Sequence, residues 1–167
     1  MTLPAFNLLP NAKKKELLQQ CCGSSAWVDK ILQALPVENL TELLALADKS
    51  WGQCTEKDWH EAFAHHPKIG DVNTLKEKFA RTADWAANEQ ASVKAATDTV
   101  LQELAQGNQT YEDKFGYIFI VCATGKSAAE MLALLKARLP NPPDVEINIA
   151  AAEQSKITKI RLQKLLQ

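Results

Sequence analysis

The sequence predicts an all-α fold, a single helical domain over residues 1–167 with seven or eight helices. Apolar residues recur at helical spacing along most of the chain, and helix-capping residues stand where these stripes begin. The connections between candidate helices are short, which is typical of a helical bundle. A chain of this length can bury a core without disulfides or metal.

Three helices are expected in the first part of the chain. Asn11 is a plausible N-cap for the first, and Gly23 ends it. Ser24 or Ser25 caps the second, and a third apolar stripe follows Asn39. The expected spans are residues 12–22, 25–35 and 40–51.

A fourth helix leads into the pair His66-Pro67. Thr55 and Asp58 resemble a capping box at its start. Pro67 ends it, because proline restricts the residue before it and has no N–H to donate. A histidine at a helix end lies where the helix dipole can tune its charge. Taken alone, the pair favours the simpler interpretation, in which His66 only ends a helix at the surface.

Four further helices are expected after residue 70. Ser127 and Glu130 form an S-x-x-E capping box for one of them, and Gly107 is expected to end another. Glu89 stands in the apolar row of the longest, where a carboxylate is costly unless it is paired or used. The expected spans are residues 74–79, 83–106, 127–139 and 144–166.

Two features of the later chain bear on a site. Residues 115–123 are rich in aromatic and β-branched side chains but have no second strand to pair with, so an extended segment among helices is expected, with backbone amides for a ligand. In the last helix, Ile149, Ala152, Ile157 and Ile160 are expected to face the core, with Arg161 at the flank of their stripe.

Composition excludes several classes of function. Nineteen basic and twenty acidic residues give no electrostatic case for a nucleic-acid or membrane partner. No apolar window would span a bilayer, and the N-terminus does not resemble a signal peptide, so a cytoplasmic location is expected. The four cysteines have no C-x-x-C spacing, so free, mostly buried thiols are expected.

Four short motifs occur in a characteristic order: His66-Pro67 with Ile69-Gly70, then 88–90 (Asn-Glu-Gln), then 119–123 (Phe-Ile-Val-Cys-Ala), then Lys156-Ile157 with Arg161-Leu162. In this order and spacing the chain resembles the decarboxylases of purine catabolism that act on 2-oxo-4-hydroxy-4-carboxy-5-ureidoimidazoline. The resemblance covers nearly the whole chain.

The resemblance implies an all-helical, homodimeric enzyme that uses no metal and no organic cofactor and produces (S)-allantoin and carbon dioxide. Its catalytic histidine falls on His66 and its essential glutamate on Glu89. Its substrate-contacting positions fall on Pro67, Ala86, Ala87, Asn88, Glu89, Gln90, Phe119, Ile120, Val121, Cys122, Ala123 and Arg161. One departure is visible, because many relatives carry serine where this chain has Ala86.

The chemistry of such a substrate agrees with the residues present. A ring C=N bond beside the carboxylate-bearing carbon can take up the electron pair left by carbon dioxide, so no cofactor motif is needed. His66 would handle a proton, Glu89 would hold the substrate, and Arg161 would pair with an anionic or carbonyl oxygen.

Three alternatives stay open at this point. The chain could be a helical interaction module in which the same residues are core and cap positions. It could be a hydrolase acting on a ureide on the same scaffold. A metal enzyme using Cys54, His60 and His65 can also be drawn, although no second ligand cluster supports it.

Overall fold

The computed structural model describes residues 1–67, 72–80 and 90–167. Its described residues form nine helices and no strand, which confirms the all-α prediction with at least one helix more than expected. The additional helix is α1 (Leu3–Asn7), five residues long, which follows Thr2 as N-cap and carries Pro4 in its first turn. The chain divides into two compact units, and each is described by itself.

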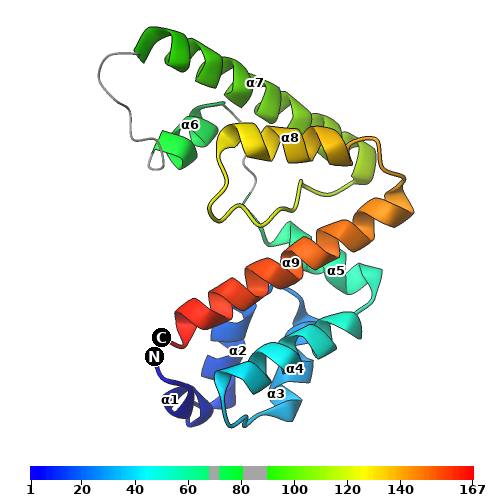
Figure 1. The fold of residues 1–167 in the computed structure, drawn as a ribbon. Helices are drawn as coiled ribbons and strands as arrows, with labels where there is room; N and C mark the ends of the chain where they lie inside the picture. Colours follow the sequence, from blue (N-terminus) through cyan, green and yellow to red (C-terminus); the bar gives the residue numbers. More distant parts are fainter. Residues whose placement is uncertain (68–71, 81–89) are drawn as a thin grey trace. The chain divides into compact units, whose positions relative to one another are not determined.

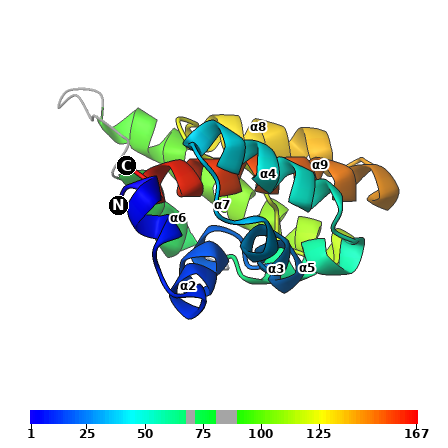
Figure 2. The same cartoon turned by 90° about the horizontal axis from the view of Figure 1, so that it is seen from below.

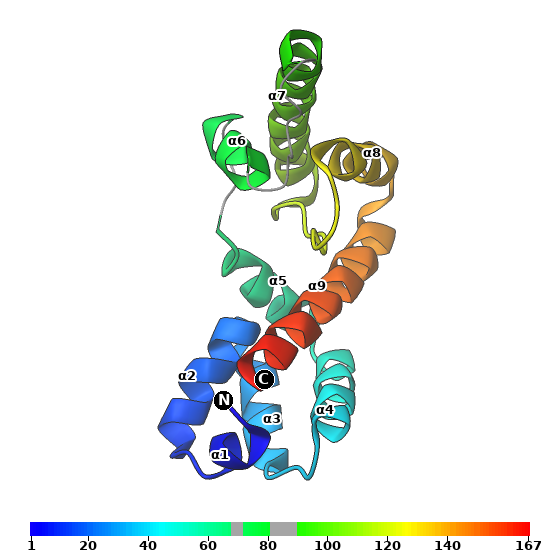
Figure 3. The same ribbon diagram turned by 60° about the vertical axis from the view of Figure 1, so that its left-hand side comes forward.

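Unit 1 consists of residues 1–66, 120–122 and 147–167. The helices of unit 1 after α1 are α2 (Asn11–Cys21), α3 (Ser25–Ala34), α4 (Leu40–Gly52), α5 (Glu56–Ala64) and, from Ile147 onward, α9 (Pro143–Leu165) (Figure 1). Helix α3 lies between α2 and α4 (Figure 3), and α5 lies on the side of α3 that faces away from α2 (Figure 2).

Hydrogen bonds to α4 fix the position of α9 within unit 1. The indole N–H of Trp51 donates to the backbone oxygen of Ala151 at 2.9 Å. Asp48 accepts from the hydroxyl of Ser155 at 2.6 Å and from the ammonium of Lys159 at 2.9 Å. These contacts hold the part of α9 that carries Arg161.

The buried face of α9 differs from the predicted one. Ala152 is exposed, and Ile149, Ile157 and Ile160 are only half-buried. In the part of α9 that belongs to unit 1, the buried positions are Ile147, Ala150, Ala151, Gln154, Thr158 and Leu162. The apolar pattern was misleading because two polar residues occupy the buried stripe, and their bonds within the helix make this possible.

Unit 2 consists of residues 67–119 and 123–146. Its helices are α6 (Val72–Ala80), α7 (Gln90–Phe115) and α8 (Ala128–Arg138), and α7 lies beside both others (Figures 1 and 3). The prediction that Gly107 ends a helix is wrong. A Cβ at Gly107 would lie 2.6 Å from Cδ2 of Leu135, so the glycine lets α7 and α8 approach closely.

None of the helices in the described ranges is long and apolar enough to span a bilayer. All four cysteines are buried and free, as predicted.

Candidate functional site

His66 lies just beyond the end of α5, at the position that the sequence predicts. The helix begins with the Thr55–Asp58 capping box, in which the backbone N–H of Thr55 donates to Asp58 at 2.8 Å. Ala62 and Phe63 are buried and fix the last turn. The backbone N–H of His66 still donates to the carbonyl of Phe63 at 3.2 Å, and Pro67 then prevents continuation.

The loop between α2 and α3 passes very close to this helix end. A Cβ built on Gly23 would lie 2.4 Å from both Cβ and Cγ of His65, a distance that no side chain tolerates. Gly23 is therefore required by the close approach to α5. The loop is also tied to α5 by Glu61, whose carboxylate accepts from the backbone N–H of Ser25 at 3.0 Å and from its hydroxyl at 2.7 Å.

Arg161 approaches the same loop from α9. Its Nη1 group donates to the backbone oxygens of Cys21 at 3.3 Å and Gln20 at 3.5 Å. These carbonyls lie at the C-terminal end of α2, where the helix dipole is negative and a cation is favoured. A guanidinium has five N–H donors, so a side chain held through Nη1 retains others that can bind an oxygen of a ligand.

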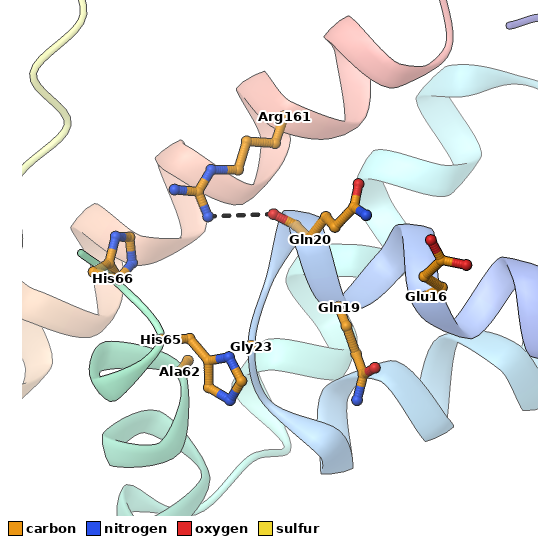
Figure 4. A pocket seen from close by; sticks show the side chains of 8 residues that line it. All are labelled: Glu16, Gln19, Gln20, Gly23, Ala62, His65, His66 and Arg161. Carbon is orange, nitrogen blue, oxygen red and sulfur yellow. Dashed lines mark hydrogen bonds between the residues drawn. The ribbon is translucent and has the colours of Figure 1, made fainter.

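His66, Arg161, Gly23 and His65 line one pocket of about 650 Å³ in unit 1. Figure 4 shows His66 and Arg161 on the α9 side of this pocket and His65 beside Gly23. The complete lining is Glu16, Gln19, Gln20, Gly23, Ala62, His65, His66 and Arg161. Its volume suits a ligand of small-molecule size.

Burial sets the protonation of the groups in and beside this pocket. It lowers the pKa of His66, and the nearby positive charges of Arg161 and His65 act in the same direction against the contact with Gln154. Burial also raises the pKa of the Cys21 and Cys22 thiols to about 11. At neutral pH the imidazole is therefore uncharged and the thiols are protonated, which favours His66 as the group that exchanges protons.

The predicted site residues in the segment 119–123 are not in the lining of this pocket. The segment is irregular, as predicted, and contains buried Ile120 and Cys122 with half-buried Val121 and Ala123. The amide of Cys122 donates to the carboxylate of Glu153 at 2.7 Å. Phe119 belongs to unit 2, where the guanidinium carbon of Arg138 lies over the Phe119 ring, 4.6 Å from the ring centre.

The remaining predicted residues border the ranges that the structure describes or lie outside them. Ala86, Ala87, Asn88 and Glu89 lie outside the described residues, and Gln90 is described only as the first residue of α7. Pro67 is exposed after the helix end. Within the described ranges, no three His, Cys, Asp or Glu side chains are grouped so that they could hold a metal ion.

Gln154 was not among the predicted site residues, and neither were the lining residues Glu16, Gln19, Gln20, Gly23, Ala62 and His65. The side-chain oxygen of Gln154 lies 2.5 Å from Nε2 of His66, and Gln154 is completely buried. A helical spacing of 147, 151, 154, 158 and 162 in the last helix was the available signal, since it places Gln154 and Thr158 in a row with apolar residues.

Comparison with known proteins now decides the family. The model of the family described as OHCU decarboxylase matches residues 7–163 of the chain. The chain belongs to the OHCU decarboxylase family. This confirms the resemblance drawn from the four motifs, and the OHCU abbreviation denotes the ureidoimidazoline named above.

Individual relatives agree with the assignment. The uric acid degradation bifunctional protein of Arabidopsis thaliana is 42% identical over 148 residues, which are 87% of this chain and 45% of that protein. The chain thus spans less than half the length of this relative. An OHCU decarboxylase crystallised in the presence of (S)-allantoin has 38% identity and a TM-score of 0.72, covering 91% of this chain and 97% of that one. An (S)-allantoin synthase, 18% identical with a TM-score of 0.70, shares the fold over 98% of this chain and 54% of that one.

Proposed function

We propose that this chain decarboxylates 2-oxo-4-hydroxy-4-carboxy-5-ureidoimidazoline to (S)-allantoin and carbon dioxide, as one step of urate degradation. The observation that carries the proposal is the match of the family model to residues 7–163, together with the 38% identical OHCU decarboxylase that covers almost the same length. The pocket adds support, because two residues that the motifs single out, His66 and Arg161, both line it.

The proposed reaction needs little from the protein beyond binding, orientation and proton transfer. The bond to the carboxylate breaks, carbon dioxide leaves, and the electron pair moves through the adjacent ring carbon to the nitrogen of the C=N bond. That nitrogen takes one proton from solvent. The hydroxyl then loses its proton to become the carbonyl of the product, while the former C=N carbon gains a proton on one face.

His66 is proposed to carry the proton from the hydroxyl to the ring carbon. Burial lowers the pKa of its imidazole, so that the resting side chain is neutral and can first act as a base. After it has accepted the hydroxyl proton it becomes the acid that protonates the ring carbon. Transfer by a positioned group of this kind accelerates a step by about 10²–10⁴, and its fixed position would set the stereochemistry.

Arg161 is proposed to hold a carbonyl or carboxylate oxygen of the substrate. Its guanidinium is anchored through Nη1 to the end of α2, which limits its movement. A planar fork that is already held loses less entropy when it binds an oxygen. Glu89 is proposed to accept hydrogen bonds from the hydroxyl or ureido N–H groups, and the backbone of residues 119–123 to contact the ring, as the family resemblance implies.

Product analysis tests this function. Urate oxidase and hydroxyisourate hydrolase would make the substrate in situ, and circular dichroism would follow the formation of chiral allantoin with and without this protein. We expect His66→Ala and Glu89→Ala each to lower the rate at least about a hundredfold while helical content is unchanged. His60→Ala is the matched control, because His60 is an exposed histidine on the same helix.

The alternatives predict different products or none. A ureide hydrolase would release ammonia or a ring-opened acid instead of carbon dioxide. An interaction module would give the spontaneous rate of the assay, and a metal enzyme would lose activity with a chelator. Full turnover by His66→Ala would remove that residue from the mechanism.

The proposal includes four properties of the whole molecule. Residues 1–167 would act as one domain, two chains would form a homodimer, and the enzyme would work in the cytoplasm without metal or organic cofactor. A single cooperative unfolding transition, sedimentation equilibrium, cell fractionation and elemental analysis test these in turn. Separate transitions for the two compact units would contradict the first.

A further inference from the structure

A buried polar pair on α9 lies directly behind His66. Gln154 is 0% exposed and Thr158 is 4% exposed, one helical turn apart. The side-chain oxygen of Gln154 lies 2.5 Å from Nε2 of His66, and its side-chain nitrogen donates to the hydroxyl oxygen of Thr158 at 3.2 Å. We call His66, Gln154 and Thr158 the Gln154 chain.

The hydrogen positions within the Gln154 chain can be assigned by starting from the hydroxyl of Thr158. The hydroxyl of Thr158 donates its single hydrogen to the backbone oxygen of Gln154 at 3.0 Å, the usual bond of a helical threonine to the preceding turn. Its oxygen is then left with lone pairs only, and it must accept from its other neighbours. The group of Gln154 that faces Thr158 is therefore the NH₂ group.

The thiol of Cys22 also contacts the Thr158 hydroxyl and agrees with this assignment. Burial raises the pKa of Cys22 to about 11, so the sulfur carries a hydrogen at neutral pH and can donate it to Thr158. A thiolate would have competed for the hydroxyl hydrogen. The protonated thiol of Cys22 therefore leaves the Thr158 hydrogen available for the backbone oxygen of Gln154.

The assignment reaches His66 through the fixed amide. Because the NH₂ group of Gln154 faces Thr158, its carbonyl oxygen faces the imidazole, and Nε2 of His66 must carry the hydrogen that this oxygen accepts. We propose that Gln154 and Thr158 are positioning residues, which hold His66 in the tautomer protonated at Nε2 and leave Nδ1 as the nitrogen that exchanges a proton with the substrate. The catalytic part of this inference rests on the proposed function.

A neutral amide in this position suits a histidine that must start uncharged. A carboxylate would orient the ring equally well but would stabilise the imidazolium, whereas an amide oxygen orients the ring without adding charge. The charged and titratable side chains that share the pocket with His66 in the described residues are Glu16 of α2, His65 at the end of α5 and Arg161 of α9. Of these, Arg161 and His65 oppose a positive charge on His66.

The direct test is the tautomer, measured on the complete, ¹⁵N-labelled protein without substrate. Long-range proton–nitrogen NMR identifies which ring nitrogen of His66 carries hydrogen, and the spectrum of His66→Asn assigns the signal. We expect protonation at Nε2 in the wild type and in Thr158→Ser, which keeps the hydroxyl. We expect a mixture of tautomers in Thr158→Val, because the amide of Gln154 loses the acceptor that fixes its orientation.

A wild-type histidine protonated at Nδ1 would overturn the inference, and so would an unchanged tautomer in Thr158→Val. Neither result depends on turnover, so both remain informative if the protein proves to have another activity. Absence of allantoin formation by the wild type would instead remove the proposed function and leave the tautomer assignment standing.

Kinetics extend the test to the positioning role. Gln154→Leu should lower kcat roughly tenfold to a hundredfold, the size of effect that hydrogen-bond partners of metal-bound histidines have, with a smaller change in KM. Gln154→Glu should raise the pKa of His66 in an NMR titration and move the acidic limb of the pH–rate profile to higher pH. Circular dichroism confirms folding of each variant, and an unmoved His66 titration in Gln154→Glu contradicts the direct contact.

Discussion

The two compact units each bury a polar cluster, and the clusters differ in charge. In unit 1 the Gln154 chain is neutral, and one end of it, His66, reaches a pocket. In unit 2 the carboxylate of Glu146 is completely buried and accepts hydrogen bonds from Arg138, Tyr111 and Asn141. We call these four residues the Glu146 cluster. Figure 1 shows the helices that supply the Glu146 cluster, α7, α8 and the first turn of α9.

The comparison separates a structural role from a functional one. Both carboxylate oxygens of Glu146 accept hydrogen bonds, from Arg138 Nε at 2.7 Å, Tyr111 at 2.5 Å and Asn141 at 2.9 Å. Arg138 further covers the ring of Phe119. Because these partners all come from unit 2 and the carboxylate is buried, we interpret the Glu146 cluster as structural. The Gln154 chain instead ends on a histidine whose ring borders a pocket.

The largest loss of stability is expected from a substitution in the Glu146 cluster. Glu146→Gln leaves the guanidinium of Arg138 buried without its carboxylate, and breaking a buried pair in this way costs about 3–5 kcal/mol. Chemical denaturation monitored by circular dichroism measures the free energy of unfolding. The matched control is Glu103→Gln, which removes the exposed ion pair with Lys136 and should cost at most about 1 kcal/mol. Equal losses in both variants would mean that burial does not distinguish the two pairs.

A smaller loss of stability is expected from a substitution in the loop between α2 and α3, where this loop contacts the end of α5. Gly23→Ala places a Cβ at 2.4 Å from two atoms of His65, neither of which is the flexible end of the side chain. Backbone must shift, at a cost of roughly 1–3 kcal/mol, and the pocket should lose shape, so KM should rise.

Gly52→Ala is the control for the glycine substitution itself. A Cβ at Gly52 meets nothing within 4 Å, and alanine favours a helix by up to about 1 kcal/mol over glycine. We expect this variant to be as stable as the wild type or slightly more stable. A Gly23→Ala protein with unchanged thermal stability and KM would show that the loop adapts without cost.

Local signals in the sequence predicted local structure well. The capping boxes at Thr55 and Ser127 are present with both of their bonds, and Ser24 caps its helix, because each motif satisfies donors within a few residues of itself. Pro67 ends α5 for an equally local reason. The functional prediction came from the family resemblance, because its four short motifs can be recognised by their order and spacing along the sequence.

Features that depend on distant contacts were not predictable in the same way. Gly107 looked like a helix end, but Leu135, twenty-eight residues later by their numbers, explains a glycine inside α7. The buried face of α9 includes Gln154 and Thr158, which hydrophobicity alone assigns to the surface. The Gln154 side chain contacts His66, which follows α5, and Thr158 bonds to Gln154 within α9.

The smallest effect is expected on the pH dependence of stability. It tests whether burial disfavours protonation of His66 in the folded protein. Burial lowers its pKa in the folded protein, whereas the unfolded chain has the ordinary value near 6.5. As the pH falls through 6.5, the unfolded chain binds a proton that the folded protein does not, so stability is lost until the pH passes below the folded pKa. Replacing the imidazole by an uncharged side chain should remove this contribution. The free energy of unfolding should therefore decrease less between pH 7.5 and 5.5 in His66→Asn than in the wild type. All other titrating groups are shared by the two proteins, so identical pH dependence would show that the imidazole is equally accessible to protons in both states.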